Sequence, residues 1–209
     1  AMINFIKLNK MKKLLITLVL IPFIGIAQTF ENLDYISPFS NGVAAIKKGN
    51  EWGFIDPEGN LIVDFRNDLV ATKTDNASYP IFSNGKCLIA NQKDGVLYYG
   101  YIDKTGKTVI TPQFLNANNF QYGKALVLKV EKETIGYNDI FKKDVVNYHY
   151  FELVIDENGN TIDHLTQLAI HVSPKDKNDK NPPAITSKLI SENLVAVKGN
   201  NKKWRIKKI

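Results

Sequence analysis

The sequence predicts an all-β fold, an array of three to four β-meander or hairpin repeat units. One observation is a Phe-x-x-Gly motif that precedes an apolar strand at Phe39, Phe82 and Phe120, with a degenerate copy at Ile190. The other is an Asp-x-x-Gly turn that recurs between the next two strands. Self-similarity of this kind is the signature of a repeat architecture, and the irregular spacing of the copies indicates inserts between and within them.

Each unit is expected to contain three strands. The first is the apolar segment after the Phe-x-x-Gly motif, found at Val43–Ile46, Cys87–Ala90, Ala125–Val130 and Leu194–Val197. The second leads into the Asp-x-x-Gly turn, in the segments Gly53–Gly59, Gly100–Gly106 and Leu153–Gly159. The third follows that turn at Leu61–Val63 and Thr108–Ile110, and more weakly at Thr161–Ile162.

Both turns have a physical rationale. An Asp carboxylate can accept a bond from the backbone two residues on, and glycine adopts a positive φ without strain. The Asp-x-x-Gly turns end at Gly59, Gly106 and Gly159. The Phe-x-x-Gly motif ends at Gly42, Gly85 and Gly123, where the fourth copy has Asn193. Because Asn tolerates the left-handed region better than most residues, we expect Asn193 to share the conformation of the three glycines.

The second strand carries the most specific motif. The first unit reads Trp52-Gly53-Phe-Ile-Asp, and the second reads Tyr99-Gly100-Tyr-Ile-Asp. Together with the two turns, these residues resemble the WG-repeat family. The third unit departs from the pattern with Glu152-Leu153, and the fourth has Trp204-Arg205. The resemblance covers roughly residues 30–163 and returns at 189–206. It implies a β-repeat scaffold common among exported bacterial proteins, with no catalytic residues to transfer.

An open array is the favoured arrangement, and a small closed, propeller-like ring is the alternative. The ring is possible because Thr29-Phe30 resembles the end of a unit, while the last unit lacks that strand. Inserts are expected at 66–81, 131–150 and 171–188. We interpret the second insert as an extended hairpin and the third as an exposed loop, because the third has too few apolar residues to pack.

Residues 1–27 are predicted to be an N-terminal extension followed by a secretory signal peptide. A basic segment after a plausible start at Met11 precedes the apolar run Leu14–Ile26, and Ala27 ends a small-x-small cleavage site. The apolar run of about fourteen residues is shorter than the roughly twenty that a membrane span needs. We therefore expect residues 28–209 to form an exported repeat domain, periplasmic, outer-surface or secreted, without a stable membrane span.

The charge distribution argues against nucleic acid as a partner. The net charge is +6, but residues 1–27 hold four Lys and no acidic residue. The remaining 182 residues carry 23 basic and 21 acidic side chains. A nearly neutral body lacks the broad basic footprint of a nucleic-acid-binding protein.

No catalytic, cofactor-binding or metal-binding residue is predicted, and no cofactor is expected. Cys87 stands where the other units have Ala44 and Ala125, which predicts a core position. The segment that starts at Asp156 resembles a calcium loop only superficially. It has Thr161 where that loop needs Gly and Gln167 where it needs Glu.

The leading hypothesis for function is an exported, non-enzymatic repeat scaffold that binds an unknown protein or cell-surface ligand. The alternative is an exported enzyme with its site in the inserts around residues 131–152. That region contains a sequence cluster of acid-base side chains, Glu133, Asp139, Asp144, His149 and Glu152. A cleft in which two of these carboxylates face each other would favour the enzyme.

The predicted leader gives a direct test. We expect cleavage before Gln28 during export, so protein recovered from the exporting cell should begin at that residue, with its N-terminal Gln able to cyclise. Intact mass spectrometry measures this. Soluble material that retains residues 11–27 would contradict the prediction.

Overall fold

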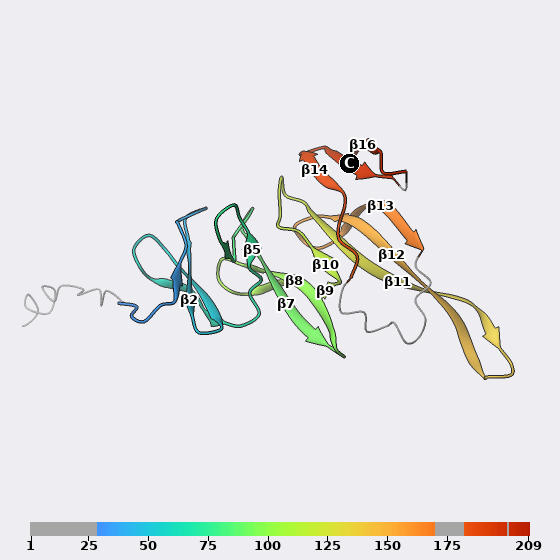
Figure 1. The fold of residues 1–209 in the computed structure, drawn as a ribbon, viewed down its shortest axis with the longest axis horizontal. Coiled ribbons are helices and arrows are strands. Elements are labelled where there is room, and N and C mark those ends of the chain that lie inside the picture. Colours follow the sequence, from blue (N-terminus) through green and yellow to red (C-terminus); the bar gives the residue numbers. More distant parts are fainter. Residues whose placement is uncertain (1–28, 170–181, 200) are drawn as a thin grey trace, which may run out of the picture.

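The computed structural model describes residues 29–169, 182–199 and 201–209, which form β-strands joined by turns (Figure 1). The predicted signal peptide and residues 171–181 of the third predicted insert lie outside the described residues. Within the described ranges, no helix is long and apolar enough to cross a membrane.

Four antiparallel sheets follow one another along the chain. Sheet 1 contains β1 (Tyr35–Ile36), β2 (Ala44–Lys48), β3 (Glu51–Ile55) and β4 (Leu61–Arg66). Sheet 2 contains β7 (Lys86–Lys93), β8 (Val96–Asp103) and β9 (Thr108–Phe114). Sheet 3 contains β10 (Asn116–Ala117), β11 (Ala125–Asn138), β12 (Lys143–Ile155) and β13 (Thr161–Ala169). Sheet 4 contains β14 (Lys188–Ser191), β15 (Leu194–Lys198) and β16 (Trp204–Lys208). A small hairpin of β5 (Thr72–Lys73) and β6 (Ser78–Tyr79) separates sheets 1 and 2 in the sequence.

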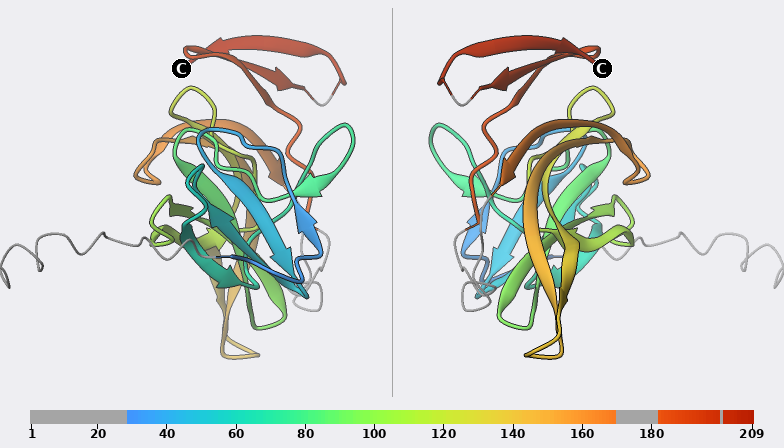
Figure 2. Two further views of the ribbon diagram at one scale, coloured as in Figure 1. Left: turned by 90° about the vertical axis from the view of Figure 1, so that its left-hand side faces the viewer. Right: turned by 90° about the vertical axis from the view of Figure 1, so that its right-hand side faces the viewer.

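The sheets form an open array, and the prediction of an all-β repeat fold is confirmed. Sheets 1, 2 and 3 follow the long axis of the molecule, and sheet 4 lies beside sheet 3 (Figure 1). Viewed along that axis, sheets 1 to 3 overlap one another (Figure 2). Sheets 1 and 4 do not meet, so the alternative of a closed ring is not formed.

The hydrophobic core lies between consecutive sheets. Successive residues of a strand point to opposite faces, so Cys87 and Ile89 of β7 pack toward sheet 1 while Leu88 packs toward sheet 3. One core joins sheets 1 and 2 and includes Val43, Ala45, Phe54, Val63, Cys87, Ile89 and Ile102. The next joins sheets 2 and 3 and includes Leu88, Tyr101, Ile110, Ala125, Val127, Leu153 and Ile155. A third joins sheets 3 and 4 through Leu126, Val154, Leu165, Val195 and Val197. Sheets 2 and 3 are therefore buried on both faces.

Cys87 occupies the core position that the sequence predicts. It is fully buried, and the loss of hydration raises the pKa of its thiol to about 12. The thiol therefore stays protonated at neutral pH, the unreactive form of cysteine.

The Asp-x-x-Gly turns fix the contact between neighbouring sheets. A Cβ added to Gly106 would lie 3.4 Å from the side chain of Val63 in sheet 1. A Cβ added to Gly159 would lie 3.2 Å from Ile110, the equivalent position in sheet 2. In each of these two turns, the glycine therefore packs against the third strand of the preceding unit.

Each Asp-x-x-Gly turn is a three-residue hairpin loop, a type I turn closed by a glycine of positive φ. The φ values of Gly59, Gly106 and Gly159 are 84°, 80° and 84°. The Asp side chain accepts backbone and side-chain hydrogen bonds within each turn. The side-chain bond from Asn60, Thr105 or Asn160 is the largest cause that lowers the pKa of Asp56, Asp103 or Asp156, respectively.

The Phe-x-x-Gly motif forms a two-residue turn in the first three units. Asn41 and Gly42 have φ values of 53° and 79°, and the amides and carbonyls of Ser40 and Val43 bond reciprocally. Positive φ at both central residues defines a type I′ turn, which matches the twist of a hairpin. Asn84-Gly85 and Tyr122-Gly123 repeat this conformation.

The prediction for Asn193 is wrong. The described residues with positive φ include neither Asn193 nor Glu192 before it. The pairing of β14 with β15 instead shifts register between Leu189 and Ser191. This irregularity lets the chain reverse without the left-handed conformation that the glycine-containing turns use.

The Gly of the Trp-Gly motif lies at a bulge in the sheet. The register of β3 against β4 shifts around Gly53, and that of β8 against β9 shifts around Gly100. A Cβ on Gly53 would lie 3.0 Å from the carbonyl oxygen of Val63. At Gly100 it would lie 2.4 Å from the carbonyl oxygen of Ile110. The third strand therefore approaches too closely for any side chain.

The first predicted insert, 66–81, is only partly an insert. The Val70 amide donates to Leu88 and the Ala90 amide donates to Asp68, so residues 68–70 pair with β7. Leu69 between them is buried. This segment corresponds to β1 in sheet 1 and β10 in sheet 3, a short N-terminal strand that the sequence reading did not predict. Two or three residues are too few to show a strand's alternating pattern.

The second insert, 131–150, extends β11 and β12 into a long hairpin that projects from the body (Figure 1). Large apolar side chains are exposed along its outer part, Ile135, Tyr137, Ile140, Phe141 and Val145.

The close strand approach predicts a sharp difference between two glycines. Gly100→Ala should reduce the free energy of unfolding by about 1–3 kcal/mol, because the new methyl group would overlap the backbone of β9. Gly136→Ala is the matched control, since no atom lies within 4 Å of its added Cβ. This variant should be neutral or slightly stabilising, by up to about 1 kcal/mol. Urea denaturation measures both, and equal midpoints would contradict the bulge interpretation.

Candidate binding site

A cavity of about 540 Å³ lies where sheets 2, 3 and 4 meet. Its described lining is rich in uncharged hydrogen-bonding side chains, Thr72, Asn116, Asn118, Asn119, Gln121 and Ser187. The ring of Tyr99 contributes to one wall, and Lys188 is the one Lys, Arg, Asp or Glu among the described lining residues. The volume falls within the range of small-molecule sites.

The amide side chains come from the segment 114–121, which connects sheet 2 to sheet 3. The Leu115 and Asn118 amides donate to carbonyls of β11 at 2.8 and 2.9 Å. The Tyr101 hydroxyl donates to the Asn118 carbonyl at 2.7 Å. The apolar members of the segment, Phe114, Leu115, Ala117 and Phe120, are buried. The polar residues between them are therefore left to line the cavity.

Asn119 holds an unpaired acceptor. Its Nδ2 donates to Thr72 Oγ1 at 2.9 Å. Its Oδ1 is shielded from solvent and has no hydrogen-bond partner. An unsatisfied buried acceptor costs about 1–3 kcal/mol.

Asn116 caps the edge of the sheet. Its Oδ1 accepts from the Ala117 backbone amide at 2.9 Å, and its Nδ2 lies 3.5 Å from the Pro183 carbonyl. The Ala117 amide, the donor on the outer edge of the short strand β10, is therefore already hydrogen-bonded.

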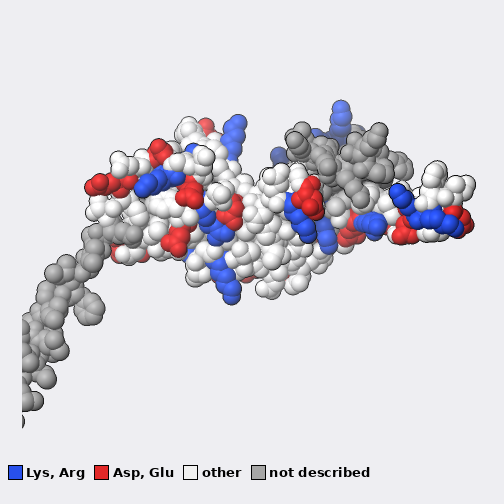
Figure 3. All heavy atoms as spheres, turned by 90° about the horizontal axis from the view of Figure 1, so that it is seen from below, with Lys and Arg blue, Asp and Glu red and all other residues white. Residues whose placement is uncertain are grey.

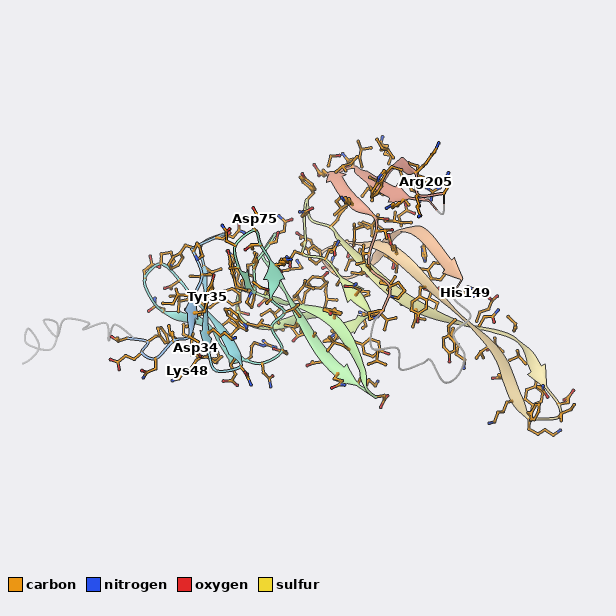
Figure 4. All side chains as sticks on the ribbon, in the orientation of Figure 1. Asp34, Tyr35, Lys48, Asp75, His149 and Arg205 are labelled. Carbon is orange, nitrogen blue, oxygen red and sulfur yellow. The ribbon has the colours of Figure 1, made fainter. Side chains whose placement is uncertain are left out.

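Tyr99 occupies the tryptophan position of the second unit. Its half-buried ring packs against the core between sheets 2 and 3. The equivalent Trp52 in sheet 1 meets the ring of Tyr35 edge to face, with centroids 5.8 Å apart, and Tyr35 in turn stacks on Tyr79 at 5.9 Å. Figure 4 marks Tyr35 on sheet 1. In sheet 1, rings fill the space around the aromatic position, whereas in sheet 2 the same position borders the cavity.

Glu152 binds the segment that brings Ser187 to the cavity wall. It is almost completely buried. One carboxylate oxygen accepts from the amide and hydroxyl of Thr186, at 2.7 and 2.9 Å. The other accepts from the amide of Ser187, at 3.0 Å, and from its hydroxyl. Hydrogen bonds to an ionised acceptor are stronger than neutral ones, so Glu152 anchors the chain where it enters β14.

For Ile185 and Ser187, this anchor corrects the expectation that the third insert, 171–188, is an exposed loop. Ser187 is buried, and Ile185 packs against the core formed by Leu115, Leu128 and Tyr150. The reading from composition missed this because a buried carboxylate, rather than apolar side chains, binds the segment.

The acid-base residues proposed for an enzyme do not converge. Glu133 and His149 pair at 2.9 Å on the hairpin, where His149 is marked in Figure 4. Asp139 lies in the hairpin turn. Asp144 and Glu152 both lie on β12, eight residues and thus about 26 Å apart. Two of the five side chains meet, and no two of the carboxylates face each other across a cleft.

The sequence reading passed over the cavity-lining amides. Four carboxamides occur within the six residues 116–121. That density, in a connection between two units, is the signal that could have identified the site. Among the described residues, no group of three or more His, Cys, Asp or Glu side chains is placed to hold a metal ion.

The Glu152 anchor predicts a large effect from a small change. Glu152→Gln replaces one acceptor oxygen with a donor that would face the donors of Thr186 or Ser187. This should reduce the free energy of unfolding by about 1–3 kcal/mol. Glu133→Gln is the matched control, because the Glu133 side chain is 61% exposed and its pair should contribute at most about 1 kcal/mol. Chemical denaturation distinguishes them, and an unchanged midpoint for Glu152→Gln would show that the anchor does not stabilise the fold.

Comparison with known proteins agrees with the repeat pattern. The family described as WG containing repeat matches residues 32–52, 52–70 and 99–132. These segments cover sheet 1 with the strand that follows it, and the junction of sheets 2 and 3. No curated protein and no solved structure matches the chain. Residues 32–70 and 99–132 therefore carry β-repeats of the WG family.

Proposed function

We propose that the protein is an exported, non-enzymatic binding module whose ligand occupies the cavity between sheets 2, 3 and 4. The observation that carries the proposal is the cavity of about 540 Å³ lined by the four carboxamides of residues 116–121. Sites for small molecules combine a pocket of this size with a few oriented polar groups.

The cavity lining supports binding rather than chemistry. The described lining residues include no Asp, Glu, His or Cys. General acid-base catalysis most often uses a His, Asp or Glu side chain within reach of the reacting atoms. Neutral amides and an aromatic ring instead supply orientation and affinity.

The repeat frame supports a preformed site. The cavity is bounded by three sheets whose cores are continuous with its walls. A site held on rigid strands loses less conformational entropy when it binds. The leader-like pattern of residues 1–27 supports export, which would place the cavity in contact with envelope or extracellular molecules.

The surface charge supports a ligand other than nucleic acid. Acidic and basic side chains are interspersed along the face shown in Figure 3. A single-sign field would be required for strong phosphate-backbone binding.

An enzymatic function remains the competing proposal because of one observation, the 2.9 Å contact between Glu133 and His149. This pair lies on the projecting hairpin, with the Glu133 side chain mostly exposed. Catalytic pairs act most strongly in sites from which water is excluded.

Hydrogen exchange of the full chain tests the binding function without assuming a ligand class. The probe is a protein-free small-molecule and glycan extract of the cell envelope. We expect slower exchange at residues 114–121 and 186–189, and the bound compound should be recovered with unchanged mass. Asn118→Ala should weaken this protection, while Asn91→Ala, an exposed amide outside the cavity lining, should not.

Two results would overturn the proposal. One is the absence of protection at both segments. The other is conversion of a compound in the extract by the wild-type protein, lost in Glu133→Gln.

A further inference from the structure

We propose that the ligand of this cavity is an uncharged, hydroxyl-rich molecule, a short oligosaccharide segment held by the carboxamides of residues 116–121 beside the ring of Tyr99. This inference rests on the proposed binding function and assigns its ligand class.

The hydrogen-bonding chemistry of the lining matches sugar hydroxyls. A carboxamide offers one acceptor and two donors, and each hydroxyl can donate and accept. Asn119 lines the cavity with its carboxamide. Asn118 and Gln121 present further carboxamides from exposed positions of the same segment. Neighbouring hydroxyls on one ring can therefore bond to neighbouring amides.

The charge of the lining selects against ionic ligands. The described lining contains no carboxylate that would attract a cation. Its one ammonium group, on Lys188, lies 5.5 Å from the ring centroid of Trp204. A cation over an aromatic face already has a favourable partner. One such lysine is a weak basis for binding a polyanion, so an uncharged ligand fits best.

The apolar part of the lining matches the C–H faces of a sugar ring. Tyr99 presents a half-buried ring, and Val70, Leu88 and Leu126 contribute aliphatic surface. Sites of this kind combine apolar walls with a few oriented polar groups. A tyrosine ring offers a large rigid contact area at a low cost in conformational entropy.

A bound peptide strand is disfavoured by the state of the backbone. Strand addition requires free amides and carbonyls along a sheet edge. The Ala117 amide is already bonded to Asn116 Oδ1 at 2.9 Å. The Val70 amide on the opposite wall is bonded to the Leu88 carbonyl at 3.0 Å. The accessible hydrogen-bonding groups belong mainly to side chains, which suits a ligand that presents hydroxyls.

Titration calorimetry with defined probes tests the ligand class. The neutral probes are maltotriose, cellotriose, mannotriose and triacetylchitotriose, and the comparison probes are trigalacturonate and end-blocked tetra-alanine. We expect at least one neutral trisaccharide to bind. Asn118→Ala should weaken its affinity about tenfold, as expected for the loss of one hydrogen bond of ordinary net strength.

Further variants locate the bound sugar. Tyr99→Ala and Asn119→Ala should weaken binding at least as much as Asn118→Ala, and Asn91→Ala should leave it unchanged. If Asn119→Ala unfolds, Asn118→Ala still tests the site. The Asn118 side chain is exposed and takes no part in the hydrogen bond between Asn119 and Thr72.

The possible results separate the ligand class from the binding function. Binding of trigalacturonate or tetra-alanine alone would overturn the assignment to neutral sugars. So would a neutral trisaccharide whose affinity is the same in Asn118→Ala and Tyr99→Ala, since that sugar binds elsewhere. If all the neutral sugars fail while the envelope extract still protects residues 114–121, the ligand class is wrong and the binding function stands. If the extract also gives no protection, the binding function itself fails.

Discussion

The face-to-face packing of consecutive sheets is the constraint on which the rest of the structure depends. Each internal sheet buries both faces, so β7 carries core residues on successive positions such as Cys87, Leu88 and Ile89. The separation of the sheets is set where the glycine of one unit's hairpin turn rests on the third strand of the unit before it, as with Gly106 on Val63. The cores of sheets 1, 2 and 3 join consecutive sheets, as in other repeat proteins. The hydrogen bond from the Asn41 side chain to the Phe82 carbonyl reinforces this contact at the other turn.

The same packing shapes the candidate site. The connection from sheet 2 to sheet 3 must place its apolar residues in the two flanking cores, which fixes Leu115, Ala117 and Phe120 inward. The residues between them have no room in the core and face the space beside sheet 4. Carboxamides at those positions line the cavity, and the packing of the sheets fixes their orientation. The buried Glu152 fixes one part of the lining, because it binds the backbone that leads into β14.

Elements that obey the repeat could be predicted from the sequence, and elements that depend on long-range contacts could not. The apolar strands and the Asp-x-x-Gly turns follow from local chemistry, so their positions agree with the sheets and with the turn glycines. The strand at 68–70 was missed because its pairing partner, not its own short pattern, makes it a strand. Asn193 was misjudged because the bulge in β14 replaces the left-handed turn. The cavity was missed because three sheets together form it, and no local motif predicts how those sheets pack.

The cavity lies at the place where the units depart from the common pattern. Sheet 1 follows the pattern, and there Trp52, Tyr35 and Tyr79 fill the space around the aromatic position. In sheet 3 the same position holds Glu152, whose short polar side chain cannot fill such a space with a ring. Glu152 binds Thr186 and Ser187 instead, and this places Ser187 in the lining of the cavity, which stays open to solvent. Departures from a consistent local pattern are expected where function imposes its own demand. A buried carboxylate in place of a tryptophan gives up aromatic packing, and it instead binds the chain that brings Ser187 and Lys188 to the cavity wall.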